Sequence, residues 1–137
     1  MVETVHNRNV VYQTAYHVVW CPKYRHDVIV GDVAEALSEM VHAVCADKGW
    51  PVIALEVQPD HLHLFVSIPP SVAVADAVKI LKGTTARRLF VRFPALKERL
   101  WGGHLWSPSY FVGTAGDVSA ETIRHYIERT EHVKGRR

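Results

Sequence analysis

Apolar and polar positions alternate most clearly over residues 61–68, HLHLFVSI. Successive side chains of a strand point to opposite faces, so this pattern predicts a half-buried strand. One face is uniformly apolar and comprises Leu62, Leu64, Val66 and Ile68. The other face comprises His61, His63, Phe65 and Ser67. We expect the apolar face to lie under helices and the two imidazoles to project from the opposite side of the sheet.

Three further segments are predicted to be strands, because β-branched and aromatic residues gather in them: 11–20, 51–57 and 105–112. The strand over 51–57 is expected to form a hairpin with the strand over 61–68 through a turn at Pro59 and Asp60. Pro108 cannot donate a ladder hydrogen bond, which indicates an edge or a bulge in the last strand.

Helical spacing predicts two long helices between these strands. Residues 32–48 carry apolar side chains every three or four positions, and Gly49 ends the helix. The second helix is expected to start at the capping residue Ser71 and to run to about Phe90. The run Gly83-Thr84-Thr85 weakens the helix prediction in its middle.

A loop is expected over residues 94–104, and a last helix is expected to begin near Ser119. The resulting order β-α-β-β-α-β-α is typical of the ferredoxin-like class of α+β proteins. We therefore expect one domain over residues 1–137, with a four-stranded antiparallel sheet, helices on one face and an additional C-terminal helix.

Composition is that of a globular protein, with 48% hydrophobic and 22% charged residues among 137. No apolar run approaches the roughly 20 residues that cross a bilayer, and the start does not resemble a signal peptide. We expect a cytoplasmic protein without a membrane partner. Cys21 and Cys45 are compatible with a reducing compartment, and Cys45 is expected to be inert core.

The net charge is only +2, but the basic residues are unevenly distributed. Seven of the 16 lie within residues 79–105, against the single acid Glu98. Such an excess indicates a polyanion, most simply a nucleic acid, although a solvated helix face is the alternative. The seven are Lys79, Lys82, Arg87, Arg88, Arg92, Lys97 and Arg99.

The two histidines are candidate metal ligands. Imidazole is the commonest side-chain ligand, and two on one strand face can share a divalent ion. A catalytic ion needs a third ligand and open positions as well, and His-x-His also occurs on ordinary sheet surfaces.

Tyr126 lies in RHYIERTEH, residues 124–132, among charged residues. A phenol has a pKa near ~10 and is a poor nucleophile unaided, but a nearby metal ion that polarises a phosphodiester offsets this. The alternative is a tyrosine that only packs against its neighbours.

Several motifs together resemble the single-tyrosine HUH transposases of small insertion sequences, which include the IS200-like and REP-associated tyrosine transposases. These are PDHLHLFVSIPP, LKGTTARRLF, RLWGGHLWSPSYFVGTAGDVSAETIRHYIE and, near the N-terminus, YHVVWCPKYRHDVI. The match runs in the family's order over about residues 10–131.

The resemblance implies a fold related to the RNA-recognition motif and an activity on single-stranded DNA. Members cut and rejoin DNA ends marked by hairpins, act as homodimers and use no nucleotide cofactor. His61 and His63 would bind Mg²⁺ or Mn²⁺, and Tyr126 would attack the phosphate to give a 5′-phosphotyrosine and a free 3′-OH. Whether the tyrosine helix serves its own subunit or its partner stays open.

One position departs from the family. A glutamine usually follows the tyrosine by one helical turn as third metal ligand, whereas this chain has Thr130 there. A threonine hydroxyl is shorter and a weaker ligand. Water, Glu131 and Asp60 are the alternatives that would complete the site.

For DNA contacts we favour four residues of the second long helix and the loop after it, namely Lys82, Arg87, Arg88 and Arg92. Lys23 and Arg25 in the first loop are secondary candidates. Trp106 and Tyr110 either stack on unpaired bases or pack against the sheet.

Two other functions compete with a mobile-element transposase. One is a domesticated relative that cleaves palindromes in its host genome. The other is a non-catalytic nucleic-acid-binding module, in which aromatic residues at the sheet centre would stack on bases. Only Phe65 suits that second role.

Overall fold

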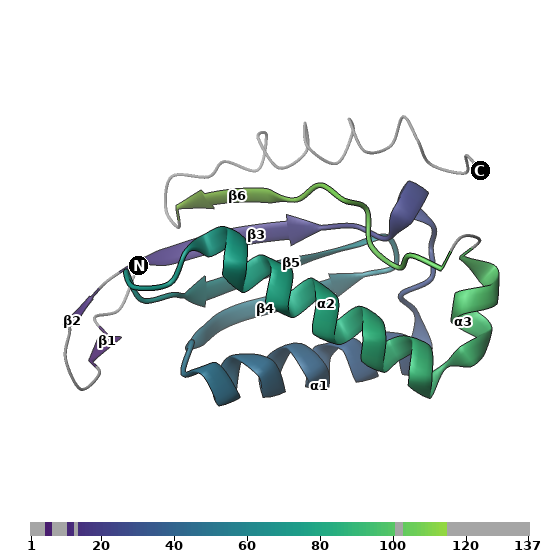
Figure 1. The fold of residues 1–137 in the computed structure, drawn as a ribbon, viewed down its shortest axis with the longest axis horizontal. Coiled ribbons are helices and arrows are strands. Elements are labelled where there is room, and N and C mark those ends of the chain that lie inside the picture. The colour runs from purple at the N-terminus through teal and green to yellow at the C-terminus, as the bar shows by residue number, and fades with distance from the viewer. Residues whose placement is uncertain (1–4, 7–10, 13, 101–102, 115–137) are drawn as a thin grey trace.

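The computed structural model describes residues 5–6, 11–12, 14–100 and 103–114. Within them, four strands form an antiparallel sheet in the order β4-β5-β3-β6 (Figure 1). The strands are β3 (Ala15–Trp20), β4 (Val52–Gln58), β5 (His61–Ser67) and β6 (Phe111–Thr114). Two long helices, α1 (Gly31–Lys48) and α2 (Val74–Arg92), cover one face of this sheet (Figure 1). This order, with two βαβ crossovers, confirms the ferredoxin-like α+β class.

A short hairpin and two short helices were not separated in the prediction. The predicted strand over 11–20 is divided between β2 (Val11–Tyr12), which pairs with β1 (Val5–His6), and β3. A 3-10 helix, η1, spans Lys23–Arg25. The expected loop over 94–104 contains α3 (Pro94–Arg99), which starts with proline because the first helical position needs no amide hydrogen.

The β4–β5 hairpin agrees with the prediction. Gln58 pairs with His61 across the two-residue turn Pro59-Asp60. The predicted apolar face of β5 is fully buried, since Leu62, Leu64 and Val66 are all 0% exposed. These side chains meet α1 and α2 in the main core.

The second helix differs from the prediction at its start. It begins at Val74 rather than at Ser71, and no side chain caps it. It continues without interruption through residues 83–85, where the Thr85 hydroxyl donates a hydrogen bond of 2.8 Å to the Leu81 carbonyl. The weak central run is therefore helical.

The last strand was predicted in the wrong place, because β6 starts at Phe111 rather than at residue 105. Leu105 and Trp106 are buried in the main core instead of alternating between two faces. The Ser107 amide donates to the Cys21 carbonyl at 2.9 Å, and Trp106 makes an isolated bridge with Pro22. The segment thus adds a bridge beyond the end of β3 before the true strand begins.

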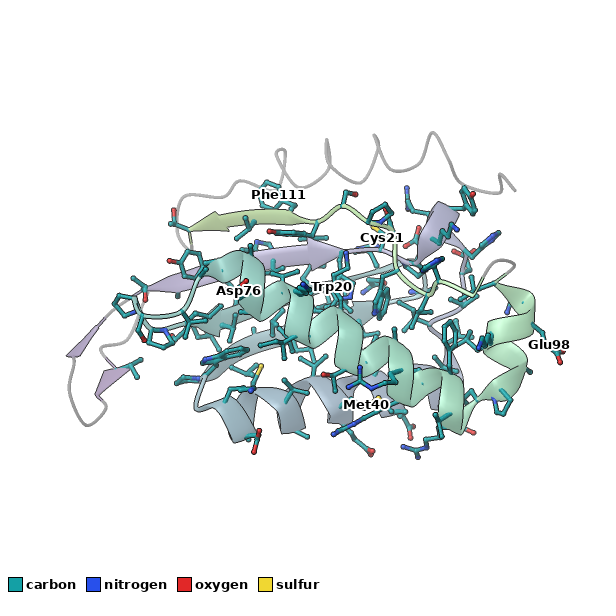
Figure 2. The ribbon with its side chains drawn as sticks, viewed as in Figure 1. Trp20, Cys21, Met40, Asp76, Glu98 and Phe111 are labelled. Atoms are coloured by element: carbon teal, nitrogen blue, oxygen red, sulfur yellow. The ribbon has the colours of Figure 1, made fainter. Side chains whose placement is uncertain are left out.

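A small second cluster lies on the sheet face away from the helices. It consists of Val19 and Cys21, both 0% exposed, with Phe111 packed against them. Trp20, between them in sequence, belongs to the main core on the helix side. Figure 2 labels Trp20 at the end of β3, Cys21 directly after it and Phe111 at the start of β6. No helix in the described ranges has the length and hydropathy to cross a bilayer.

Candidate active site

His61 and His63 lie side by side on β5, on the sheet face opposite α1 and α2. Their ring centroids are 4.9 Å apart, and both side chains are partly buried. His63 is flanked in register by Val19 of β3 and Glu56 of β4. Alternation along β5 thus puts the two rings on one face, as expected.

A buried carboxylate holds the ring of His61. Asp60 Oδ1 lies 2.8 Å from His61 Nδ1, and Asp60 Oδ2 accepts a hydrogen bond from the guanidinium of Arg25. Burial acts to raise the pKa of the Asp60 carboxyl, but the hydrogen bonds from His61 and Arg25 outweigh it. The pKa of Asp60 therefore lies below its usual value, and the group is a carboxylate at neutral pH.

A second histidine holds the ring of His63. His17 Nε2 lies 3.1 Å from His63 Nδ1, and the His17 ring stacks on Phe65 with centroids 4.1 Å apart. Burial, with a smaller effect from His63, lowers the pKa of His17 to about 4. Burial also lowers the pKa of His63, aided by His61 and opposed by Glu56. Both rings are consequently neutral near pH 7, the form that binds metals.

The donor set fits two ligands of a divalent ion. The hydrogen bonds of both rings use Nδ1, which leaves Nε2 of His61 and Nε2 of His63 without partners among the described residues. Both Asp60 oxygens are engaged by His61 and Arg25, which argues against Asp60 as the third ligand. Within the described ranges no set of three His, Cys, Asp or Glu side chains is placed to hold a metal ion. Three residues considered for this site lie outside the described residues: Tyr126, Thr130 and Glu131.

The predicted basic residues of α2 lie on the other side of the sheet. Arg87, Arg88 and Arg92 are exposed on this helix. Arg87 donates to the Gly83 carbonyl at 3.3 Å, and Arg92 approaches Glu39 of α1 at 3.9 Å. All three guanidinium groups remain accessible to phosphates, but they do not share a groove with the two histidines.

Lys82 has a different role from its neighbours. Its ammonium donates to the carbonyls of Ser107 at 2.7 Å and Ser109 at 3.2 Å, and it lies 5.8 Å from the Tyr110 ring centroid. Burial lowers its pKa, with a smaller opposing effect from Cys21. Lys82 therefore ties α2 to the segment before β6, and two of its three donors are already used.

The loop after β3, which contains Lys23 and Arg25, directs its arginine into the protein rather than toward solvent. Arg25 is only 7% exposed and is paired with Asp60, so the expectation that it contacts DNA is corrected. Tyr24 and Arg25 adopt the left-handed conformation, with φ of 58° and 52°. Lys23 remains partly exposed, with its ammonium 5.4 Å from the Tyr24 ring centroid.

The two predicted stacking aromatics occupy different environments. Trp106 is 7% exposed, donates from Nε1 to Thr85 Oγ1 at 3.0 Å and packs edge-to-face on Trp20. Its burial favours the packing alternative. Tyr110 is partly exposed and lines a pocket of about 550 Å³ between α2 and residues 103–110. Phe90, Lys79 and Arg87 also line this pocket.

Two site residues could not be assigned from the sequence. The position of Asp60 directly before His61 was a usable signal, but its pairing with Arg25 joins residues 35 apart. The contact of His17 with His63 depends on the β3–β5 register, in which His17 pairs with Phe65 and Val19 with His63. Patterning within one strand carries no such information.

Known proteins resemble this chain over nearly its whole length. The profile of the family described as "Transposase IS200 like" matches residues 10–130. The ISDra2 transposase TnpA of Deinococcus radiodurans is 48% identical over 97% of this chain and 94% of the relative. The transposase of insertion sequence element IS200 from Salmonella typhimurium is 30% identical over 82% of this chain and 76% of the relative.

Solved structures agree. A crystal structure of a transposase candidate from Deinococcus radiodurans R1 has a TM-score of 0.84 and 42% identity, covering 92% of this chain and 97% of that one. A REP-associated tyrosine transposase bound to a REP hairpin has a TM-score of 0.54 at 16% identity, covering 93% and 73%, which shows the fold. On these matches, the expected resemblance is confirmed and the chain belongs to the IS200-like transposase family.

Proposed function

We propose that this transposase cuts and rejoins single-stranded DNA at hairpin-marked ends, with Tyr126 as the nucleophile and His61 and His63 as ligands of Mg²⁺ or Mn²⁺. The observation that supports this most directly is the pair of imidazoles, His61 and His63, on one sheet face, each with an Nε2 that no other described residue engages. A divalent cation bound there would withdraw charge from a phosphodiester oxygen.

The tyrosine chemistry conserves bond energy. Tyr126 Oη gives up its proton and attacks the phosphorus, the bond from phosphorus to the 3′-oxygen breaks, and that oxygen takes up a proton. The products are a 5′-phosphotyrosine and a free 3′-OH. In the second step a 3′-OH from another DNA end attacks the same phosphorus, a new phosphodiester forms and the phenol is released. No ATP is consumed, because one ester replaces another.

The exposed arginines of α2 supply the means to hold the DNA. Arg87, Arg88 and Arg92 offer phosphate contacts, and the neighbouring pocket offers Tyr110 and Phe90 to an unpaired base. The hairpin bound by the REP-associated relative supports a hairpin as the DNA form. We propose, from the family resemblance, that two copies of the chain act as a homodimer.

The non-catalytic alternative loses its main support in the sheet. Phe65 is stacked on His17, so the one aromatic suited to base stacking at the sheet centre is occupied by a protein ring. The domesticated relative shares the same chemistry and differs in genomic context.

A covalent-adduct assay tests the proposal. The protein is incubated with Mn²⁺ or Mg²⁺ and labelled single-stranded hairpin DNA with its flanks from the ends of the element, and the products are run on a denaturing gel. We expect an adduct with the wild-type protein, none with Tyr126→Phe or His61→Ala, and wild-type levels with His42→Ala, which changes an exposed histidine of α1. Hairpin binding without an adduct in the wild type would support the non-catalytic module instead, and an adduct with Tyr126→Phe would overturn the nucleophile assignment.

A further inference from the structure

We infer that Asp60 and Arg25 are positioning residues, which hold His61 in the tautomer that presents a lone pair at Nε2. The function of this arrangement rests on the proposed metal site, but the arrangement itself is a property of the metal-free protein. It assigns a role to an arginine that the sequence placed among DNA contacts.

The tautomer of His61 follows from the chemistry of its partner. A carboxylate has only acceptor oxygens, so the 2.8 Å contact with Asp60 Oδ1 requires His61 Nδ1 to carry the proton. In the neutral ring Nε2 then keeps its lone pair. Carboxylate partners of this kind are known to orient metal-binding histidines and to raise their basicity.

Arg25 in turn holds Asp60. Its guanidinium donates to Asp60 Oδ2, and both residues are buried. The left-handed backbone at Tyr24 and Arg25 directs this loop back toward the β4–β5 turn, and the Ile29 amide donates to the Pro59 carbonyl at 3.0 Å. The carboxylate is therefore fixed from the side opposite His61, and rotation away from the ring would break a buried ion pair.

His63 offers an internal comparison. Its partner is the imidazole of His17, which can donate or accept at the 3.1 Å contact, and His17 Nδ1 is buried without a partner among the described residues. Geometry alone does not bias His63 toward either tautomer. The two rings are therefore unequal: the tautomer of His61 is fixed before a metal binds, whereas the contact with His17 leaves both tautomers open to His63.

Nitrogen NMR of the metal-free protein reads this out directly. Long-range ¹H–¹⁵N spectra of protein with ¹⁵N-labelled histidine should show His61 protonated at Nδ1 and unprotonated at Nε2. Asp60→Asn should shift His61 toward the Nε2–H tautomer, because Arg25 takes the single amide oxygen and the amide NH2 is left facing Nδ1, which must then accept. The double variant Arg25→Met/Asp60→Leu, which removes both charges and leaves no buried ion unpaired, should shift His61 toward the Nε2–H tautomer.

Mn²⁺ affinity, measured by the EPR signal of free Mn²⁺, provides the second readout. The double variant should bind Mn²⁺ about 10- to 100-fold more weakly, as outer-shell changes at metal sites do. Asp60→Asn should also weaken Mn²⁺ binding, because it favours the wrong tautomer of His61, whereas Asp27→Asn, which changes an exposed carboxylate of the same loop, should leave the affinity unchanged. If the double variant does not fold, the tautomers of the wild type and Asp60→Asn still decide.

The inference is overturned if wild-type His61 carries its proton on Nε2, or if the folded double variant keeps both the Nδ1–H tautomer and wild-type affinity. A wild-type protein with the expected tautomer but no Mn²⁺ binding would instead overturn the proposed metal site. The two failures are thus distinguishable.

Discussion

Thr85 shows how one side chain can satisfy two buried groups. Threonine in the middle of a helix lowers helix propensity. Here its hydroxyl donates to the Leu81 carbonyl and accepts from Trp106 Nε1 at 3.0 Å. The residue that weakened the helix prediction therefore provides the acceptor that a buried tryptophan needs.

We expect Thr85→Val, which keeps the shape and removes the hydroxyl, to lower the free energy of unfolding by about 1–3 kcal/mol, because Trp106 Nε1 is left buried without an acceptor. Urea denaturation measures the change. Thr84→Val on the adjacent, less buried position is the matched control and should cost less. An equal loss in both variants would mean that helix propensity, rather than the tryptophan hydrogen bond, sets the cost.

Cys45 illustrates how burial suppresses reactivity. The thiol is 0% exposed, and burial raises its pKa to about 11. At pH 8 only about one molecule in a thousand carries the reactive thiolate. We expect native protein to react with a disulfide reagent at Cys45 only on the time scale of unfolding, measured in a Cys21→Ala background, and to react at once in denaturant. Rapid labelling in native buffer would contradict the core assignment.

The positions of single side chains were predicted correctly where the periodicity of one strand decides which face they occupy. The alternation in 61–68 placed His61 and His63 on one face and the leucines on the other, and the burial of Leu62 and Leu64 agrees. The direction of Arg25 was not predictable, because it depends on two consecutive left-handed residues that no glycine marks. Its positive charge alone favoured an exposed side chain in contact with DNA.

At the scale of elements, the segment between α3 and β6 shows the limit of composition. Leu105 and Trp106 resemble the start of a strand, yet both pack into the core beneath α2. Lys82 then ties α2 to the Ser107 and Ser109 carbonyls. Strand propensity describes a side chain that suits a half-buried surface, and a buried loop that bridges two elements contains the same residue types. The start of β6 therefore depends on tertiary contacts.

We expect Lys82→Met to lower the free energy of unfolding by about 1–3 kcal/mol, because two carbonyls lose a charged donor. Amide hydrogen exchange should accelerate in residues 107–110 more than elsewhere. Lys79→Met, one turn earlier on the same helix and exposed, is the control and should change neither measurement. Unchanged exchange in Lys82→Met would show that the other contacts of this segment, such as the Ser107 amide bond to the Cys21 carbonyl, hold it without Lys82.

At the scale of the whole molecule, the proposed DNA contacts and the proposed metal ligands lie on opposite sides of one sheet. α2 lies over one face of the sheet (Figure 1) and carries exposed arginines. His61 and His63 lie on the opposite face of β5, since they alternate with the buried Leu62 and Leu64. The sequence predicted both the basic helix and the histidine pair, but charge and spacing do not report how the two are connected around the sheet. In the proposed function, DNA held by α2 would have to pass an edge of the sheet to reach the histidines. β6 is the edge strand next to the α2 pocket.

This separation predicts that DNA binding and metal affinity can be changed independently. Arg87→Gln/Arg88→Gln should weaken hairpin binding and reduce the slope of log affinity against log salt by about 0.9 for each duplex phosphate that the variant no longer neutralises, with Mn²⁺ affinity unchanged. His61→Ala should weaken Mn²⁺ binding and leave hairpin affinity and its salt dependence unchanged. Fluorescence anisotropy over a salt series measures the first effect and EPR of free Mn²⁺ the second, with Lys48→Gln on α1 as a charge control. If the double arginine variant also fails to bind Mn²⁺, the two faces are coupled, and DNA binding and metal binding share one site after all.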